Sequence, residues 1–397
     1  MKIAILSTGN LNDMKGIMNY VHEKAFRFKE STFPDIESTC FFIITKYSGI
    51  LGLLHRSNKN DNQKVKDGDI IHKDGVDYNI IIRKYNLLEA IACFLCKDFI
   101  STSFVKKVKK RLNEFDIITA HQLPCIYTSY LIKQMTGKPY IATWHGSDIN
   151  ISPKSSKRLF KATKIVIENA NMNFFVSKGL MKASSYITNN GIKDYIYTGP
   201  SSRFYKYTDT EKQKLRKKYG VNESKVVLFC GNLIPIKNVL ILPKVFYYLT
   251  NKLPNTNIIF WIVGNGEQEQ TLNEKLKEVK VNYKMFGKVE PRDIPDLMNC
   301  ADILILPSIN EGFPLVILEA RTCGCNVVAS DVGGIPESAG TNNVFSLGET
   351  FANQISDRMV EIITNNEQPE PLDKEYSWEY AIKKEIKLIK TLLNKVN

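Results

Sequence analysis

The chain has 397 residues, of which 43% are hydrophobic and 24% are charged, a composition typical of a soluble globular protein. Its length allows two domains with hydrophobic cores of their own. No uninterrupted apolar run approaches the roughly 18 residues that a membrane-spanning helix needs, so the sequence predicts a chain that does not cross a bilayer.

The formal net charge is +13, which indicates an anionic partner or reflects a sequence rich in lysine, asparagine and isoleucine throughout. Segment 106–111 holds five cations and follows the apolar residues 87–100. An amphipathic, basic stretch of this kind fits the surface of an anionic membrane, and a solvated helix face is the alternative. Nucleic acid is not predicted as a partner, because basic motifs interleaved with aromatic residues and zinc-ligand spacings are missing.

The cysteines and acidic pairs do not indicate a metal site. Eight cysteines are scattered along the chain without a recognisable secretory signal ahead of them, which favours reduced thiols in the cytoplasm. Cys93 and Cys96 have metal-ligand spacing, but their apolar neighbours favour buried packing. Asp67 and Asp69 have the D-x-D spacing of metal-dependent sugar transferases, yet they lie in a polar stretch that favours a surface turn. We therefore predict neither a metal ion nor another cofactor.

In the first half of the chain, short apolar runs alternate with helical patterns. A strand is predicted at 2–7, followed by a polar loop with Gly9 and Gly16 and a helix at 21–28. Further strands are predicted at 40–45, 78–83, 116–120, 140–144 and 172–176, and helices at 159–169 and 178–187. Alternating strands and helices predict a parallel sheet that is covered on both faces.

The alternation stops at Gly199-Pro-Ser-Ser202 and resumes after a charged helix at 210–219. The second set of strands is predicted at 225–230, 257–263, 285–289, 301–307 and 326–330, and a final amphipathic helix at 378–393. We expect two Rossmann-like, doubly wound α/β domains that face a central cleft, with a boundary near 200–210.

The sequence E-G-F-P-L-V-I-L-E between Glu311 and Glu319 lies between two predicted strands and reads as a tight loop followed by a helix. Pro314 suits the first helical turn, and Gly324 suits the helix stop. The loop would aim backbone N–H groups and the positive end of a helix dipole at a ligand, between two carboxylates. A ligand with both hydroxyls and phosphate fits this arrangement, and a nucleotide sugar has both.

Glycine turns at the ends of neighbouring strands accompany this loop, at Gly231, at Gly264 and Gly266, and at Gly287. Together they would line one edge of one sheet. Lys237 follows the first of these turns, where a lysine can face a diphosphate; a solvated surface lysine is the alternative.

In the first half, His145 follows the strand at 140–144, with Asp148 placed to orient its imidazole in the cleft. A structural histidine at a strand end is the alternative. The loop that contains Gly16 would let the backbone approach phosphate or acceptor. It lacks the full G-x-G-x-x-G spacing with a later acidic residue, which disfavours a dinucleotide-dependent dehydrogenase.

The second half resembles the retaining family-4 (group 1) glycosyltransferases of the GT-B fold. The residues that carry the resemblance are Gly231 with Lys237-Asn238, Val263-Gly-Asn-Gly-Glu267, Phe286-Gly287, Leu306-Pro-Ser308, Glu311-Gly-Phe-Pro314 with Glu319-Ala320, and Val332-Gly-Gly-Ile-Pro-Glu337. The first half is similar more loosely, through His145-Gly-Ser-Asp148 and Gly16. The resemblance implies an acceptor-side domain of residues 1–203, on which the helix 376–397 packs back, and a donor domain of residues 204–375.

The resemblance also implies roles for individual residues. Glu311 would hold the hydroxyls of the donor sugar, Lys237 would neutralise the leaving diphosphate, and His145 would face the reacting sugar. Glu319 would bind the ribose hydroxyls. The remaining donor contacts would come from Gly16, Gly231, Asn232 and the backbone of Gly312, Phe313, Pro314, Leu315 and Val316.

Two departures from the family pattern are visible. Asn232 stands where the family usually has arginine, so one cation of the expected diphosphate clamp is missing. Gly199-Pro-Ser-Ser202 replaces the Asn-Gly-Val-Asp linker motif of the family.

The predicted function is transfer of a hexosyl group from a UDP- or GDP-sugar to a glycan or lipid-linked acceptor in cell-surface polysaccharide synthesis. The resemblance implies retention of configuration through same-face attack, without a metal ion, by a protein that is cytoplasmic or peripheral at the inner membrane face. A soluble sugar phosphorylase of the same fold, or a nucleotide-sugar epimerase, is the alternative. Such a phosphorylase would carry pyridoxal phosphate on a lysine, and no lysine is singled out for that role.

Overall fold

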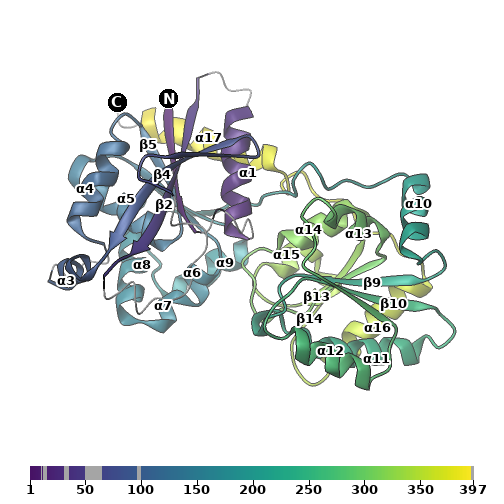
Figure 1. Ribbon diagram of the computed structural model, residues 1–397. Helices are drawn as coiled ribbons and strands as arrows, with labels where there is room; N and C mark the ends of the chain where they lie inside the picture. Colours follow the sequence, from purple (N-terminus) through teal and green to yellow (C-terminus); the bar gives the residue numbers. More distant parts are fainter. Residues whose placement is uncertain (10, 12–15, 31–34, 50–64, 96–99, 395–397) are drawn as a thin grey trace. The chain divides into compact units, whose positions relative to one another are not determined.

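A computed structural model describes residues 1–9, 11, 16–30, 35–49, 65–95 and 100–394 of the chain (Figure 1). The described residues form two compact units. The first comprises Met1–Ile196 and the C-terminal segment that starts at Trp378, and the second comprises Tyr197–Ser377. Cys96 and most of the polar stretch before Asp67 lie outside the described residues, so the prediction for the Cys93–Cys96 pair does too.

The first unit is built on one sheet with the strand order β3-β4-β2-β1-β5-β6-β7-β8. Its strands are β1 (Lys2–Thr8), β2 (Glu37–Tyr47), β3 (Ile70–Lys73), β4 (Val76–Tyr85), β5 (Ile117–His121), β6 (Tyr140–Trp144), β7 (Met172–Phe175) and β8 (Lys193–Tyr195). Every strand that the sequence predicts here is confirmed. The hairpin of β3 and β4 was not predicted, although its turn residues Asp74 and Gly75 both have positive φ, as a two-residue hairpin turn requires.

Helices connect these strands, as expected for parallel neighbours. They are α1 (Ile17–Glu30), α3 (Leu87–Leu95), α4 (Thr102–Arg111), α5 (Leu123–Thr136), α6 (Ser147–Asn150), α7 (Ser152–Ser155), α8 (Lys157–Asn169) and α9 (Lys178–Ala183), with the 3-10 turn η1 (Ser184–Tyr186). The last helix, α17 (Trp378–Asn394), returns to the first unit and packs beside α1 (Figure 1).

The second unit contains a parallel sheet with the strand order β11-β10-β9-β12-β13-β14. Its strands are β9 (Lys225–Cys230), β10 (Ile258–Val263), β11 (Tyr283–Gly287), β12 (Ile303–Leu306), β13 (Asn326–Ser330) and β14 (Val344–Phe345). The predicted strand at 285–289 is shifted toward the N-terminus, because the chain leaves the sheet at Gly287, whose φ is 65°.

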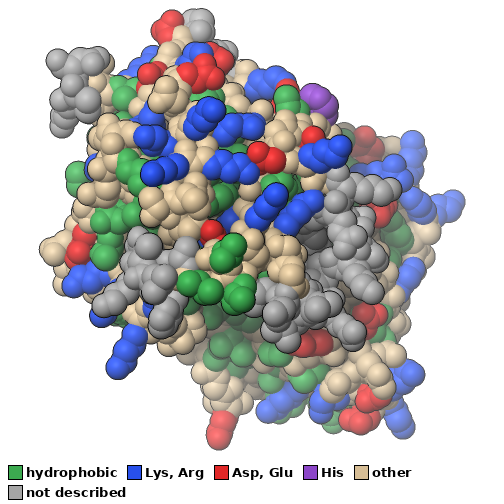
Figure 2. Space-filling view, turned by 60° about the vertical axis from the view of Figure 1, so that its left-hand side comes forward, with side chains coloured by type: hydrophobic (Ala, Val, Ile, Leu, Met, Phe, Trp, Pro, Cys, Tyr) green, Lys and Arg blue, Asp and Glu red, His purple; other side chains and the backbone are tan. Residues whose placement is uncertain are grey.

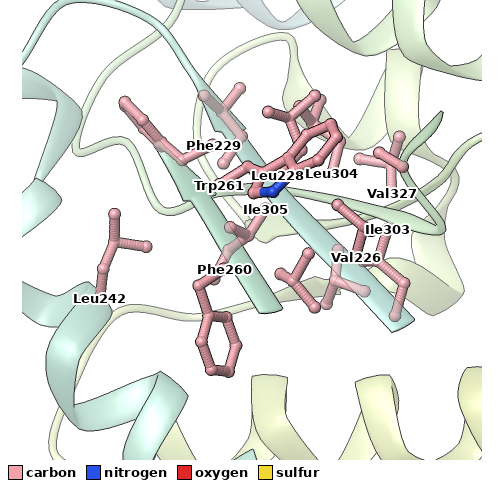
Figure 3. Packing of buried hydrophobic residues seen from close by; sticks show 14 of the residues in the cluster. Val226, Leu228, Phe229, Leu242, Phe260, Trp261, Ile303, Leu304, Ile305 and Val327 are labelled. Carbon is pink, nitrogen blue, oxygen red and sulfur yellow. The ribbon is translucent and has the colours of Figure 1, made fainter. Parts of the chain in front are cut away.

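The second unit also contains α-helices and short 3-10 turns. They are α10 (Asp209–Tyr219), α11 (Leu242–Lys252), α12 (Glu269–Glu278), α13 (Ile294–Cys300), α14 (Leu315–Thr322), α15 (Ile335–Ala339) and α16 (Phe351–Thr364), with the 3-10 turns η2 (Pro235–Lys237), η3 (Val239–Ile241) and η4 (Thr341–Asn343). Neighbouring residues of β10 face opposite sides: Phe260 points toward Leu242 of α11, and Trp261 points to the other face (Figure 3). Phe260 stacks on Phe246 of α11 at a centroid distance of 3.9 Å. The sheet is therefore buried on both faces, as its continuous apolar strands indicate.

Both sheets reverse their winding direction next to their first strand. In the first unit β1 lies between β2 and β5, and in the second unit β9 lies between β10 and β12. Parallel sheets of this kind bind ligands beyond the carboxyl ends of the strands at such a point. The segments that follow β9 and β12 are therefore the places to look for a ligand site in the second unit, and those that follow β1 and β5 in the first.

Within the part of the chain that the structure describes, no helix is both long enough and apolar enough to span a membrane.

Candidate functional site

Glycines hold the loops at the carboxyl edge of the second sheet in direct backbone contact. A Cβ atom added to Gly264 would lie 1.9 Å from the carbonyl oxygen of Gly231, and one added to Gly333 would lie 1.8 Å from that of Glu311. A Cβ on Gly266 would lie 2.3 Å from the carbonyl oxygen of Leu233. Real side chains do not tolerate such distances, so the loops after β9, β10, β12 and β13 keep this arrangement only with glycine at these positions.

Two predicted catalytic residues meet beside these loops. The ammonium group of Lys237, at the end of η2, donates a hydrogen bond to Oε1 of Glu311, and the hydroxyl of Ser308 donates to the same oxygen at 2.8 Å. The N–H of Ile309 donates to the carbonyl of Ile236 at 2.8 Å and ties the two segments together. The Lys237 and Glu311 side chains remain 21% and 14% exposed, so the pair is open to a ligand from one side.

The predicted turn after β9 lies against the same lysine. Gly231 and Asn232 follow Cys230, the last residue of β9, and the N–H of Gly231 donates to the carbonyl of Val263 at 3.0 Å. A Cβ on Gly231 would lie 4.0 Å from Cε of Lys237, so the aliphatic chain of Lys237 runs over this turn. Sequence reasoning placed Gly231 and Lys237 on one edge, and the structure brings them into contact.

The helix after the E-G-F-P loop starts one residue later than predicted. Pro314 is the N-cap residue of α14, which runs from Leu315 to Thr322, so Pro314 precedes the first helical turn and does not form part of it. Proline fixes its own φ but donates no N–H, and its extended ψ of 101° turns the chain into the helix. The first N–H groups of α14 have no partner within the helix, and the positive end of its dipole is at Leu315 and Val316.

Glu319 lies within electrostatic reach of the Cys230 thiol at the end of β9. Burial and the Glu319 carboxylate, opposed by the Lys237 cation, raise the pKa of this thiol to about 12. Glu319 and Lys237 therefore flank the end of β9, where the winding of the sheet reverses.

Aromatic stacking fixes the loop residue Phe313. Its ring stacks on Tyr197 at 5.1 Å and on Tyr376 at 6.1 Å between centroids. The Tyr197 hydroxyl donates to the Glu337 carboxylate, and the Tyr376 hydroxyl donates to the Glu337 carbonyl at 2.6 Å. Sequence reasoning gave these three supporting residues no role; Glu337 appeared there only as the last letter of a family motif.

In the first unit, Asp148 does not orient the imidazole of His145, contrary to the prediction. Its Oδ1 accepts the backbone N–H groups of His145 at 3.1 Å and of Gly146 at 3.0 Å, so it shapes the turn after β6. The ring is held elsewhere: Nε2 of His145 lies 3.0 Å from Nδ1 of His121, and the Tyr20 ring meets it edge-on at 4.7 Å. A short carboxylate bound to its own turn cannot also reach the ring, which explains the wrong prediction.

A buried ion pair lies behind the two histidines. Nζ of Lys24, in α1, is 2.7 Å from Oε1 of Glu385, in α17, 2.7 Å from Oγ1 of Thr119 and 3.3 Å from Nε2 of His121. The Lys24 and Glu385 side chains are only 1% and 2% exposed. Burial, and to a smaller extent the Lys24 cation, lower the pKa of His145 to about 3, so its imidazole is neutral at physiological pH.

Sequence reasoning missed this pair, although a signal was present. In α1 the buried positions include Val21, Lys24, Ala25 and Phe28, so Lys24 falls on the apolar stripe of the helix. In α17 the same spacing places Glu385 among Trp378, Ala381, Ile382, Ile386 and Ile389. A charged residue at a core-facing position is rarely buried unless it is paired.

Gly16 directly precedes α1, the helix that carries Tyr20 and Lys24. Its φ is 52°, and its carbonyl accepts the N–H of Tyr20 at 3.2 Å. Tyr20 contacts the His145 ring, so α1 connects the two predicted site residues of the first unit, Gly16 and His145. The loop residues 12–15 lie outside the described residues.

The basic segment 106–111 forms most of α4, but the apolar face of this helix is used within the domain, through Phe104, Val105 and Val108. Lys107 donates to the carbonyl of Ile82 at 2.8 Å and pairs with Asp67 at 2.6 Å. The exposed apolar surface lies instead on the preceding helix, α3, at Leu87, Leu88 and Ile91, which are 53%, 76% and 43% exposed. The face shown in Figure 2 carries many Lys and Arg side chains beside a smaller group of hydrophobic ones.

The D-x-D pair is engaged in local structure. Oδ1 of Asp67 accepts the N–H of Ile82 at 2.8 Å, and Oδ2 of Asp69 accepts the N–H of Lys66 at 2.7 Å. Among the residues that the structure describes, no group of three or more His, Cys, Asp or Glu side chains is arranged to hold a metal ion.

Comparison with known proteins agrees with the resemblance in the second half. Residues 211–377 match the model of the family described as glycosyl transferases group 1. A curated relative is the putative teichuronic acid biosynthesis glycosyltransferase TuaC of Bacillus subtilis, 28% identical over 238 residues, which are 59% of this chain and 58% of TuaC. The matched segment thus covers less than two thirds of that relative.

Solved structures agree with the fold. Anabaena HepE in complex with UDP superimposes with a TM-score of 0.68 at 19% identity, over 92% of this chain and 91% of HepE. Sucrose-phosphate synthase from Thermosynechococcus elongatus gives a TM-score of 0.71 at 16% identity, over 99% of both chains. With the two doubly wound parallel sheets, these likenesses confirm the predicted GT-B fold.

Proposed function

We propose that this chain, which belongs to the group 1 glycosyltransferases over residues 211–377, transfers a hexosyl group from a UDP- or GDP-sugar to a glycan or lipid-linked acceptor. The observation that carries the proposal is the cluster of Lys237, Glu311 and Ser308 at the carboxyl edge of the second sheet, beside the N-terminus of α14. The UDP bound to HepE supports the donor class. The name of TuaC supports a role in cell-surface polysaccharide synthesis.

Lys237 and α14 supply the stabilisation that this reaction needs. Cleavage of the bond between sugar and diphosphate leaves positive charge on the sugar ring and negative charge on the diphosphate. The Lys237 cation and the first N–H groups of α14 are fixed before the reaction, so they stabilise the leaving group without rearrangement. In comparable sites one such group contributes about 3 kcal/mol to lowering the barrier.

The contact between Lys237 and Glu311 is compatible with a bound donor. An ammonium group has three N–H donors, so Lys237 can keep its hydrogen bond to Glu311 and also donate to a phosphate oxygen. A carboxylate accepts at two oxygens, and Oε1 of Glu311 already holds Lys237 and Ser308. Its Oε2 is then the oxygen for the sugar hydroxyls, while Glu319 binds the ribose.

The first unit would provide the acceptor side, with His145 facing the reacting sugar as a neutral imidazole. The acceptor would attack from the face that the diphosphate leaves, with a phosphate oxygen taking its proton, which retains the configuration. Lys237 and α14 carry the charge in this scheme, and we propose that no metal ion is needed.

The donor assignment is tested by incubating purified protein with a panel of UDP- and GDP-sugars and following release of the nucleoside diphosphate, with and without EDTA. Release from one donor class, unchanged by EDTA and reduced in Glu311→Gln, is the expected result. Formation of a sugar 1-phosphate from a glycan and orthophosphate, without cleavage of any nucleotide sugar, would identify a phosphorylase. Absence of donor cleavage across the panel, with donor binding unchanged in Glu311→Gln, would contradict the proposal.

A lipid-linked acceptor would bring the enzyme to the inner face of the membrane. We propose peripheral contact through the exposed apolar residues of α3 and the lysines of α4, because anionic lipid headgroups complement the lysines and the apolar side chains enter the interface. Lys106 and Lys110 are exposed on α4 and would contact the headgroups.

Co-sedimentation with vesicles of phosphatidylcholine and phosphatidylglycerol tests this contact. Leu88→Asp is expected to reduce binding several-fold, since a charge there must leave the interface. Ile192→Asp is the matched control, because Ile192 is also exposed, at 58%, and precedes β8. Equal binding of both variants and the wild type would exclude α3 as the contact.

A further inference from the structure

A continuous line of buried hydrogen-bonding groups connects the C-terminal helix to His145. It starts at the Glu385 carboxylate, passes through the Lys24 ammonium and the His121 ring, and ends at Nε2 of His145. Two charged groups removed from water are retained only as a pair, because either alone would neutralise or destabilise the fold. The carboxylate therefore keeps Lys24 protonated.

The protonation of each group along this line follows from counting donors and acceptors. An ammonium group donates only, so the ring nitrogen that faces Lys24, Nε2 of His121, must carry a lone pair. A neutral imidazole has one N–H, so His121 carries its proton on Nδ1 and donates it to Nε2 of His145 at 3.0 Å. Nε2 of His145 is then the acceptor, and the proton of His145 is on Nδ1.

Both histidines are neutral, as this assignment requires. Burial lowers the pKa of His121 well below its ordinary value, and the Lys24 cation and His145 lower it further. The same two causes, burial and Lys24, act on His145. A cation at one end of the line thus disfavours a second positive charge on either ring.

We propose that Glu385, Lys24 and His121 form a positioning relay that holds His145 as the Nδ1–H tautomer, so that His145 offers the reacting sugar a hydrogen-bond donor and not a base. The inference rests on the proposed position of His145 beside the reacting sugar. In this proposal α17, which packs on the first unit, contributes Glu385 to the relay. His145 then holds a sugar oxygen, and the acceptor proton goes to the leaving phosphate.

The tautomer can be observed directly and without activity. In protein labelled with ¹⁵N-histidine, long-range proton–nitrogen spectra distinguish a protonated ring nitrogen from an unprotonated one, and His145→Asn identifies the His145 signals. The expected spectrum has a protonated Nδ1 and an unprotonated Nε2 on His145. A protonated Nε2 on His145 in the wild type would overturn the proposal, whether or not the protein transfers sugar.

Replacing Lys24 tests the relay. Lys24→Met removes the donor that fixes His121, so the spectrum is expected to show a mixture of tautomers on His145. An unchanged His145 spectrum in Lys24→Met would overturn the relay. Lys384→Met is the control, since Lys384 precedes Glu385 in α17 but its Nζ donates to the carbonyl of Tyr195 at 2.6 Å and pairs with Asp194 at 2.9 Å, outside the relay.

The double variant Lys24→Met with Glu385→Met separates positioning from folding. It removes both buried charges, so the fold is expected to be retained, while the histidine tautomers remain unfixed. If the protein is a glycosyltransferase, kcat of the double variant is expected to fall by about 10- to 100-fold with donor KM unchanged. The loss is expected to be smaller than the roughly 10⁴-fold found for a wrong tautomer where the imidazole itself moves a proton, because His145 only donates a hydrogen bond. Wild-type kcat in a folded double variant would contradict the relay, whereas absence of transfer by the wild type would contradict only the proposed function.

Discussion

The carboxyl edges of the two sheets are built in different ways. In the second unit, most site residues lie close together in sequence, from Ser308 to Glu319, with Lys237 added from the loop after β9, and glycines lock these loops backbone to backbone. In the first unit, His145 is held by side chains from distant parts of the chain, Lys24, His121 and Glu385, all of them buried. Loop geometry determines the site in the second unit, whereas side-chain hydrogen bonds determine the position of His145 in the first unit. The two sites therefore respond differently to substitution.

The largest effect is expected from Glu311→Gln in the second unit. The change removes the carboxylate that holds Lys237 and Ser308, and we expect transfer to fall at least about 100-fold, in the range found when one preorganised group is lost from an active site. Glu349→Gln, at an exposed glutamate of the same unit, is the control. Initial rates for both variants check the prediction, and a Glu311→Gln rate within threefold of the control would contradict the assigned role.

The next largest effect on the transfer rate is expected at Gly333, whose backbone contacts the Glu311 carbonyl. Gly333→Ala places a methyl group against the Glu311 carbonyl, which must move, and we expect the rate to fall about 10-fold or more because small displacements in an active site are costly. Gly340→Ala is a matched control, since Gly340 also has positive φ, 84° against 56°, but no atom lies within 4 Å of the added methyl. Both variants carry the backbone strain, so a difference between them in donor KM and melting temperature reports the contact alone. Equal values would show that the loops are not locked at Gly333.

In the first unit, the two neutral histidines predict a loss of stability in acid. The ordinary pKa of His145 is 6.5 and its folded value is about 3, so between these values the unfolded chain binds a proton that the folded chain does not. The free energy of unfolding therefore falls as the pH falls below 6.5, and His121 adds to the loss. Burial raises the pKa of Asp148 from 3.8 to about 6, which acts in the opposite direction in that window.

The two histidines and Asp148 have opposite effects, so the free energy of unfolding is expected to fall by about 1.4 kcal/mol per pH unit near pH 5. Denaturation monitored by tryptophan fluorescence measures the free energy of unfolding of the first unit in a Trp261→Phe background, because the remaining tryptophans, Trp144 and Trp378, lie in that unit. Asp148→Asn is expected to steepen the loss, and His145→Gln to reduce it. A free energy of unfolding that is constant between pH 4 and 6.5 would contradict neutral histidines.

The smallest effect is expected from Tyr197→Phe. The variant keeps the stacking on Phe313 and loses the hydrogen bond to Glu337, so we expect about 1 kcal/mol of lost stability and a change of a few-fold in donor KM. Tyr376→Phe, which loses its bond to the Glu337 carbonyl, should behave similarly. A melting temperature unchanged in both variants would mean that stacking alone fixes Phe313.

The sequence predicted the fold well because both units repeat one local pattern. Continuous apolar runs mark strands buried on both faces, and every predicted strand is present. The unpredicted strands are short: β3 depends on the Asp74-Gly75 turn, which was not recognised, β8 has three residues, Lys193–Tyr195, and β14 has two, Val344–Phe345. Patterns of that length contain too few alternations to be detected.

The site could be predicted where its residues are neighbours in sequence. Glu311, Phe313 and Glu319 lie within one motif, and their arrangement follows from a loop and a helix. Lys24 and Glu385 are 361 positions apart, so no local pattern joins them, and only their places on the apolar stripes of two helices marked them. The role given to Asp148 was wrong because spacing does not distinguish a side chain that binds its own turn from one that binds a ring.

A crystal structure with a bound nucleotide sugar tests the central claim most directly. The account predicts the diphosphate at Lys237 and the N-terminus of α14, the sugar on Glu311 and the ribose on Glu319. A nucleotide bound in the first unit, with the loop at Glu311 unoccupied, would contradict it.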